Sequence, residues 1–333
     1  MQPTTISSWG VLIWKAIESH GCDPRSLFEQ AGLDPKKLRD PNGRYPISAL
    51  TRLWRRAAKS TADSCIGLTA ARFLHPTTLH ALGYSWLASD TLREALERGE
   101  RYHRLVSNGF EARLETSPDH YRFVMQPGEG VVFADEAIDA AMATILMMCR
   151  ASCGAEFNPL RVQMTRKTPT DPGAYSRLFR APVEYGADTN AFLFDKGVAD
   201  SVLPTGNAEL ARANDRVITD YLIRFDRGSI KRRVELKLLE QLSSGHASQD
   251  TIAKALHMSP RTLQRKLRDE GATYKELLDS TRRYLAAQYV KESRLSVSEI
   301  TFLLGFSEPA NFSRAFKRWT GRSPSEYRTD LSG

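Results

Sequence analysis

Four hydrogen-bonding side chains lie close together near residue 260, at spacings of three and four residues. They are Arg261, Gln264, Arg265 and Arg268. On an α-helix this spacing puts them on one face, with Leu263 and Leu267 on the opposite face. Arginine can donate two hydrogen bonds to O6 and N7 of guanine, and glutamine pairs with N6 and N7 of adenine. Such a face predicts contact with base edges in the DNA major groove.

A second face of this kind lies 49 residues further on. Its members are Ala310, Ser313, Arg314 and Lys317, with the large apolar residues Phe312, Phe316 and Trp319 behind them. Arginine and lysine also hold the phosphates that position a protein on the duplex. The side chains that we assign to phosphates are Arg268, Lys317, Arg318 and Arg322.

The two faces belong to an internal repeat. "TIAKALHMSPRTLQRKLRDEG" aligns with "EITFLLGFSEPANFSRAFKRWTG" at an offset of 48 residues up to Ser259 and Ser307, and of 49 beyond them. Each copy predicts a helix, a tight turn capped by serine, and a second helix, which is helix-turn-helix spacing. A single basic amphipathic helix is most often solvated surface, but two tandem copies, at about 250–271 and 297–321, favour DNA binding.

A spacer separates the two copies. "TYKELLDSTRRYLAAQYVKES" predicts one continuous helix of roughly 20 residues, which would be about 30 Å long. Two recognition helices must lie about 34 Å apart to enter successive major grooves on one face of DNA. A single chain could therefore occupy two adjacent grooves.

The region after residue 230 shows no strand pattern and several helix start signals. Ser259 precedes Pro260, and three Ser/Thr-x-x-Glu capping boxes follow. The boxes are Thr273 with Glu276, Ser296 with Glu299, and Ser323 with Glu326. We therefore expect an all-α C-terminal domain over residues 229–333.

The first two-thirds of the chain predicts an α+β domain over residues 1–228, with the boundary at 226–229. Residues 1–75 look helical, with stretches of three- and four-residue apolar spacing separated by Gly and Pro. Thr91 with Glu94 forms a further capping box. Alternation predicts a hairpin from 109–116 and 120–126 and further strands at 160–166 and 191–195. Helices are expected at 135–153, 174–182 and 207–225.

Composition agrees with this division. The chain has 333 residues and a net charge of +8, and residues 231–333 hold 19 Lys and Arg against 12 Asp and Glu. This asymmetry indicates a polyanion partner for the C-terminal third. A signal peptide and a membrane-spanning stretch are not expected, and the four cysteines form no disulfide framework, so a cytoplasmic location with reduced thiols is the expectation.

Other constellations carry weaker signals. Cys149 and Cys153 share a helical face and could form a thiol sensor, but two buried small hydrophobes are the favoured interpretation. The histidines His75, His80 and His103 lack metal-site spacing, and the aromatic residues Trp86, Tyr102 and Tyr121 could line a pocket or pack in the core. Motifs for catalysis, cofactors or metals are not found, so we expect no enzyme, no cofactor and no metal site.

Residues 296–328, "SVSEITFLLGFSEPANFSRAFKRWTGRSPSEYR", resemble the signature of the AraC/XylS family of bacterial transcription regulators. The resemblance covers roughly residues 232–330 and implies a seven-helix DNA-binding domain. It also implies base contacts from the early part of each recognition helix. By motif position these fall on Arg261, Gln264, Arg265, Pro309, Ala310, Asn311, Ser313 and Arg314. Because proline and alanine side chains form no hydrogen bonds, we expect the first copy to dominate specificity.

Two N-terminal stretches, "LGYSWLASDTLREALERGERYHRLV" and "YSRLFRAPVEYGADTNAFLFD", are similar to the arabinose-binding-type sensor region of one subset of that family. The label names a domain type and identifies no ligand-contact residue. This resemblance implies effector binding and dimerisation.

These observations predict a DNA-binding transcription regulator, expected to be an activator that responds to a small molecule. Its expected partners are promoter DNA, the effector, RNA polymerase and a second copy of the chain, with no membrane partner. One alternative is a regulator controlled by abundance or protein contact without a ligand. Another is a metabolite-binding protein or enzyme with an incidental basic domain.

Overall fold

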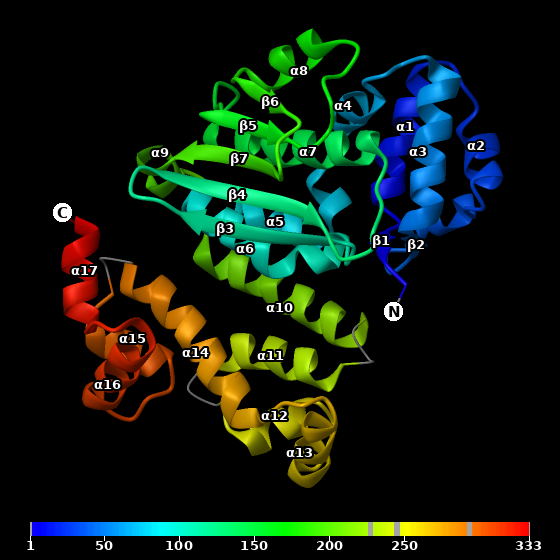
Figure 1. Cartoon of the computed structure of the whole chain (residues 1–333). Helices are drawn as coiled ribbons and strands as arrows, with labels where there is room; N and C mark the ends of the chain where they lie inside the picture. Colours follow the sequence, from blue (N-terminus) through cyan, green and yellow to red (C-terminus); the bar gives the residue numbers. More distant parts are fainter. Residues whose placement is uncertain (1, 226–228, 243–246, 292–294, 333) are drawn as a thin grey trace. The chain divides into compact units, whose positions relative to one another are not determined.

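The computed structural model describes residues 2–225, 229–242, 247–291 and 295–332 (Figure 1). The chain divides into two compact units, residues 1–218 and 219–333, and each has its own hydrophobic core. Most of the boundary segment expected from the sequence, residues 226–228, lies outside the described residues. The N-terminal α+β class and the all-α C-terminal class are both confirmed.

The N-terminal unit begins with helices that surround a short strand pair. These elements are β1 (Thr4–Ile6), α1 (Trp9–Ser19), α2 (Pro24–Gln30), η1 (Pro35–Arg39), β2 (Arg44–Pro46), α3 (Ile47–Thr61), α4 (Ile66–Ala71), η2 (Pro76–Leu79), α5 (Ala81–Leu87) and α6 (Leu92–Val106). The sheet and its connections follow. They are β3 (Phe110–Thr116), β4 (His120–Pro127), α7 (Asp135–Cys153), β5 (Arg161–Met164), α8 (Pro172–Phe179), β6 (Val183–Tyr185), β7 (Asn190–Asp195) and α9 (Lys196–Asp200).

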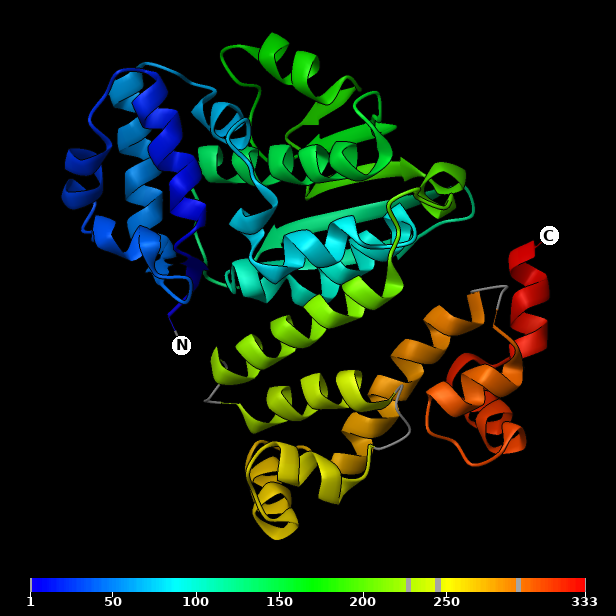
Figure 2. The same cartoon turned by 180° about the vertical axis from the view of Figure 1, so that it is seen from behind.

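The main sheet has the strand order β3-β4-β7-β5-β6. Its pairs are antiparallel except β5 with β6, which are parallel. The hairpin predicted from alternation is confirmed as β3 and β4, in which Leu114 lies opposite Phe123. Helix α6 packs against β3, and α7 packs against α4 and α5 (Figures 1 and 2). The helices and the sheet thus enclose one apolar core.

The expectation of helices over residues 1–75 omits a short strand pair. Strands β1 and β2 form an antiparallel pair, with Thr5 opposite Tyr45. Arg44 contributes to this pairing from within β2, since its Nε donates to Thr4 Oγ1 at 2.8 Å and its Nη1 donates to the Leu105 carbonyl at 2.7 Å. Three-residue strands are too short to carry an alternating pattern, so these long-range contacts specify them.

Helix α7 has the bounds that the sequence predicts, Asp135–Cys153, and is largely buried. Its fully buried Asp139 accepts hydrogen bonds from Arg166 and from the hydroxyl of Tyr175, the latter at 2.7 Å. Burial raises the pKa of Asp139 to about 7, and the charge of Arg166 opposes this rise. A titratable group thus lies inside the core of the N-terminal unit.

The C-terminal unit contains helices and, among its described residues, no strand. Helix α10 (Ala208–Phe225) contains the division between the units. The others are α11 (Ile230–Gln241), α12 (Gln249–Ala255), α13 (Pro260–Asp269), α14 (Tyr274–Lys291), α15 (Val297–Leu303), α16 (Pro309–Thr320) and α17 (Pro324–Ser332). Helices α11 to α17 are the seven helices that the family resemblance implies.

The predicted capping boxes in the C-terminal unit are confirmed. Thr273 N donates to Glu276 at 2.8 Å, Ser296 N donates to Glu299 at 2.7 Å and Ser323 N donates to Glu326 at 2.7 Å. These bonds lower the pKa of each glutamate. The box predicted at Thr91 is half right. Thr91 Oγ1 accepts from Glu94 N at 3.1 Å, but the Glu94 carboxylate accepts from Asp90 N, not from Thr91 N.

Candidate functional site

The first helix-turn-helix unit consists of α12, a short turn and α13. Ile252 and Ala253 of α12 and Leu263 and Leu267 of α13 are buried in the core of the C-terminal unit. Ser259 caps α13 by accepting a hydrogen bond from Thr262 N at 3.2 Å, and Pro260 occupies the first helical position. The predicted start of this recognition helix is confirmed.

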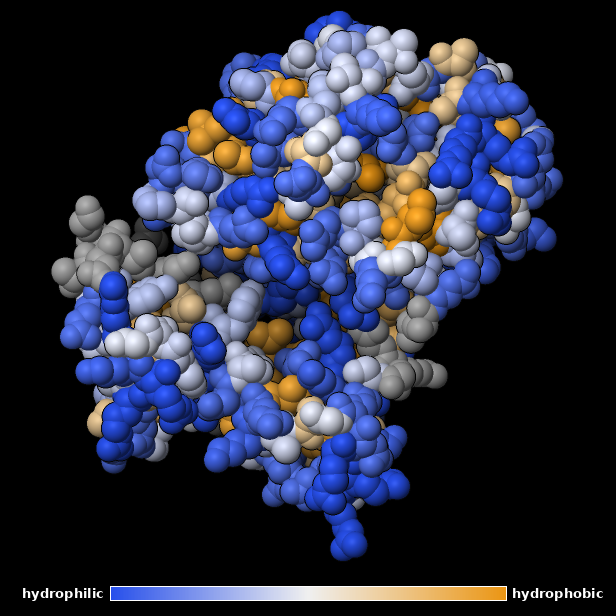
Figure 3. All heavy atoms as spheres, viewed as in Figure 1, coloured by the Kyte–Doolittle hydropathy of each residue, from blue (hydrophilic) through white to orange (hydrophobic). Residues whose placement is uncertain are grey.

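Helix α13 presents the four side chains predicted from their spacing, Arg261, Gln264, Arg265 and Arg268, which we call the free face of α13. All four are exposed. Within the described part of the chain none of them forms a hydrogen bond or an ion pair. The surface over α13 is hydrophilic in Figure 3. These donors are therefore available to an external acceptor.

The second helix-turn-helix unit consists of α15, a turn and α16. Its turn is one residue longer than the first, which explains why the repeat offset changes from 48 to 49 residues. The prediction that Ser307 caps the second helix is wrong. The cap position is Glu308, whose side chain makes no capping bond, and Ser307 Oγ instead accepts a hydrogen bond from Asn311 Nδ2 at 3.2 Å.

The exposed face of α16 is already partly engaged. Arg314 Nη2 donates to Asn311 Oδ1 at 2.7 Å, so the two side chains with the most hydrogen-bonding capacity are joined to each other. Pro309, Ala310 and Lys317 are exposed, and Ser313 is partly exposed. Among the phosphate candidates, Arg318 forms an exposed ion pair with Asp279 at 3.3 Å, and Arg322 is exposed. The second face therefore has fewer donors available than the first.

Helix α14 connects the two units. It is one unbroken helix of 18 residues, about 27 Å long. It packs against α11 and against α15, α16 and α17. Its buried side chains include Leu277, Leu285 and Val290. The predicted spacer is thus a packed element of the core.

One residue of α14 organises the second turn, and the sequence analysis missed it. Arg282 Nε donates to the Leu304 carbonyl at 2.8 Å and Nη2 donates to the Gly305 carbonyl at 2.7 Å. Its guanidinium carbon lies 4.4 Å from the centre of the Phe306 ring, which is a cation–π distance. Arg282 lies in an ordinary helical run with no motif, so only its contacts identify it.

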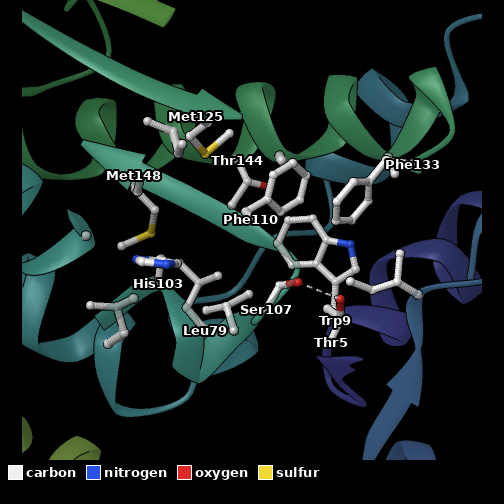
Figure 4. A pocket seen from close by; sticks show the side chains of 18 of the residues that line it. Thr5, Trp9, Leu79, His103, Ser107, Phe110, Met125, Phe133, Thr144 and Met148 are labelled. Atoms are coloured by element: carbon white, nitrogen blue, oxygen red, sulfur yellow. Dashed lines mark hydrogen bonds between the residues drawn. The ribbon is translucent and has the colours of Figure 1, made fainter. Parts of the chain in front are cut away.

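The N-terminal unit contains a cavity of about 120 Å³ that is partly open to solvent. Side chains from α1, α3, α5, α6, β3, β4 and α7 line it, and Figure 4 shows Trp9, Phe110, Phe133 and Met148 among them. Of the three aromatic residues considered from the sequence, Trp86 lines this cavity. Tyr102 and Tyr121 are buried core residues outside the lining, and the Tyr121 hydroxyl donates to Asp200.

Most polar groups at the cavity have protein partners. Thr5 Oγ1 donates to Ser107 Oγ at 3.1 Å (Figure 4), and Thr51 donates to the Val132 carbonyl at 3.2 Å. His103 Nδ1 donates to the Glu100 carbonyl at 2.8 Å. Two groups differ. Thr144 Oγ1 and the indole Nε1 of Trp86 are buried and have no hydrogen-bond partner among the described residues.

The cysteine pair does not have the features of a thiol sensor. Cys149 is fully buried, and burial raises the pKa of its thiol well above the usual value. Burial also raises the pKa of Cys153 to about 11. Reactive cysteines have depressed pKa values, so both thiols are protonated at neutral pH and the packing interpretation is favoured.

The described residues also bear on the expectations about metal sites and membrane spans. No group of three or more His, Cys, Asp and Glu side chains there could hold a metal ion. No helix built from those same residues is long and apolar enough to cross a membrane.

Two family models match the chain. One, described as the arabinose-binding domain of AraC transcription regulator, N-term, matches residues 21–203. The other, described as a helix-turn-helix domain, matches residues 252–330. The second match spans both helix-turn-helix units and α17.

Individual proteins resemble the chain along most of its length. It is 28% identical to an ornithine utilization regulator of Pseudomonas aeruginosa, over 94% of this chain and 92% of the relative. It is 25% identical to the HTH-type transcriptional regulator VirS of Mycobacterium tuberculosis, over 92% of this chain and 91% of the relative. Among solved structures, the transcriptional regulator CdpR from Pseudomonas aeruginosa aligns with 96% of this chain and 98% of its own, at 20% identity and a TM-score of 0.46.

Proposed function

Because this chain belongs to the AraC family of transcription regulators, we propose that it recognises a promoter with α13 and α16 in two adjacent major grooves. It is a sequence-specific DNA-binding regulator with an N-terminal domain of the effector-sensing type. The exposed, unpartnered free face of α13 is the observation that carries the proposal. Arginine and glutamine donors without internal partners can bind base edges without first breaking a bond.

The two recognition helices contribute unequally in this proposal. Arg261, Gln264 and Arg265 of α13 read bases, and Arg268 holds a phosphate. In α16 the base-reading positions are Pro309, Ala310, Asn311, Ser313 and Arg314, and the phosphate positions are Lys317, Arg318 and Arg322. Since Arg314 and Asn311 are bonded to each other, α16 loses an internal hydrogen bond when it reads a base. This supports a dominant first copy.

The remaining assignments concern partners. A small molecule binds the N-terminal unit and shifts the DNA-binding state, which requires that it bind two states of the protein with different affinity. As an activator, the protein would contact RNA polymerase, and it would act as a homodimer in the bacterial cytoplasm, where promoters lie. Both relatives described above are named as regulators and not as enzymes, and we propose no catalytic activity.

Selection of genomic fragments by the purified full chain, followed by footprinting of the enriched site, tests the proposal. We expect protection of two adjacent major grooves on one DNA face, upstream of a gene. Binding that is indifferent to sequence, or lost at physiological salt, would contradict it. The variant Lys275→Ala is the control for loss of a positive charge away from the proposed DNA contacts, and its footprint should match that of the wild type. Lys275 is exposed near the start of α14 and lies outside α13 and α16.

A further inference from the structure

The cavity of the N-terminal unit has a chemical character that restricts what it can bind. Among the residues that the structure describes, no Asp, Glu, Lys or Arg lines it, and His103 is the one titratable residue in that lining. A charged ligand loses its hydration on entering such a site and finds no ionic partner there, so its binding is unfavourable. The cavity therefore selects against amino acids and other ionised metabolites.

The cavity also selects against sugars. A monosaccharide carries a hydroxyl on nearly every carbon, and each buried hydroxyl needs a hydrogen-bond partner. The lining is dominated by side chains such as Trp54, Leu79, Phe123 and Met125. The hydroxyls of Thr5 and Thr51 already donate to protein acceptors. Too few polar groups remain to satisfy a polyol.

Two donors remain for a ligand that carries a single acceptor. The hydroxyl of Thr144 and the indole N–H of Trp86 are buried on cavity-lining residues without partners among the described residues. Thr144 lies among the side chains around the cavity in Figure 4. A buried donor without an acceptor destabilises the folded protein. A ligand carbonyl or ether oxygen that reached either donor would recover part of that cost.

The volume restricts ligand size. A cavity of 120 Å³ is somewhat smaller than the engineered cavity of about 150 Å³ that admits benzene. Small lining residues on α7, Ala137 and Ala141, border the space next to the bulky aromatic side chains. The volume is therefore of the order that a single ring fills.

We propose that this cavity is the effector site and that its ligand is a small, uncharged, largely apolar ring compound with one hydrogen-bond acceptor. The inference rests on the proposed effector-sensing function of the N-terminal unit. Acetophenone has the required chemistry. Isopropylbenzene has the same number of non-hydrogen atoms and no carbonyl, so the pair separates apolar fit from hydrogen bonding.

Calorimetric titration of the full chain with acetophenone, isopropylbenzene, L-lysine and L-arabinose tests the ligand class. We expect the two aromatic probes to bind and the two polar probes not to bind. Ala141→Leu fills the cavity and should weaken both aromatic probes at least tenfold. Ala151→Leu, at an exposed position of the same helix, should leave both affinities unchanged.

A second pair of variants tests the hydrogen bond independently of cavity filling. Thr144→Val removes the hydroxyl with little change of shape and should weaken acetophenone about fivefold while sparing isopropylbenzene. Ser152→Ala removes another buried, unpartnered hydroxyl of α7 that does not line the cavity, and should change neither affinity. This pair remains informative if Ala141→Leu fails to fold.

The outcomes separate the inference from the proposed function. If L-lysine or L-arabinose binds and alters the DNA footprint while the aromatic probes do not bind, the ligand class is wrong but effector sensing stands. If the aromatic probes bind equally to Ala141→Leu, the cavity is not their site. If they bind at the cavity but leave the footprint unchanged, the site inference is supported and the effector role of this cavity is contradicted.

Discussion

Arg265 lies in the middle of the free face of α13, where it is exposed and without a partner in the described part of the chain. If it reads a base, Arg265→Ala should relax preference at one position of one half-site, at a cost of about 1–3 kcal/mol on the preferred sequence. Affinities for a panel of single-base variants of the footprinted site measure this. An equal loss on every sequence would make Arg265 a phosphate contact.

Lys317 is exposed on α16, a turn after the positions that we propose to read bases. As a phosphate contact it releases condensed counterions on binding, so Lys317→Ala should weaken binding on all sequences and lower the slope of log K against log[salt] by about one. Titrations at several salt concentrations give the slope. A slope equal to that of the wild type would place Lys317 away from the DNA backbone.

The two turns contain a matched pair of residues in the left-handed backbone region. His257 has φ of 56° and Gly305 has φ of 64°. Because a side chain is strained at such angles, His257→Gly should raise the free energy of unfolding of the C-terminal unit by about 0.5–1 kcal/mol. Gly305→Ala should lower it. Denaturant titration measures both, and destabilisation by His257→Gly would show that the histidine side chain compensates for the strain.

At the scale of elements, Arg282 couples α14 to the second turn through its bonds to the carbonyls of Leu304 and Gly305. Arg282→Ala should lower the free energy of unfolding by about 2 kcal/mol, because two charge-assisted hydrogen bonds are lost. As the protein concentration is lowered, the variant should also lose protection of the groove assigned to α16 at a higher concentration than protection of the groove assigned to α13. Footprinting over a range of protein concentrations measures the order. Loss of both protections together would mean that Arg282 acts on the whole unit.

The elements also show what sequence could predict. The starts of α13, α14, α15 and α17 were predicted because their caps are local, with donor and acceptor within three residues. Strands β1, β2 and β6 could not be predicted because each has only three residues. Strand β1 pairs with the distant β2, and β6 pairs with β5, which lies on the other side of α8 in the sequence. The cap of α16 was misassigned because an extra turn residue moved the helix start from Ser307 to Glu308.

Of the two candidate sites, one could be predicted from the sequence and the other could not. The free face of α13 could be predicted because helical periodicity alone puts its residues together. The cavity could not, because its lining comes from helices and strands distributed between Thr5 and Met148. Trp86, Tyr102 and Tyr121 are the aromatic residues that the sequence offers for such a role, and of these three Trp86 lines the cavity. Thr144 had no signal at all, since an unsatisfied hydroxyl is visible only once its neighbours are known.

At the scale of the molecule, Asp139 makes the N-terminal unit sensitive to pH. Its pKa in the folded state is about 7, against an ordinary value of 3.8, so between these values the folded state holds a proton that the unfolded state releases. This group therefore contributes a loss of stability as pH rises from about 4 to 7. Between pH 5 and 7, the stability of Asp139→Asn relative to wild type should rise by about 2 kcal/mol.

Denaturant titrations of the wild type and Asp139→Asn at several pH values measure this difference. The exposed Asp188 supplies the control variant Asp188→Asn, which should follow the wild-type curve. Parallel curves for wild type and Asp139→Asn would mean that Arg166 keeps the buried carboxylate ionised throughout this range.

The unbroken α14 has a consequence for the DNA as well as for the protein. If α13 and α16 both bind DNA, the packed helix α14 between them fixes their separation. Two recognition helices joined by a flexible linker could adjust it. Inserting one base pair between the half-sites shifts one of them by about 3.4 Å and turns it by about a tenth of a helical revolution. Promoters bound by this chain should therefore tolerate substitutions between the half-sites far better than insertions or deletions. Their spacing would be preserved over evolutionary time even where the intervening sequence drifts.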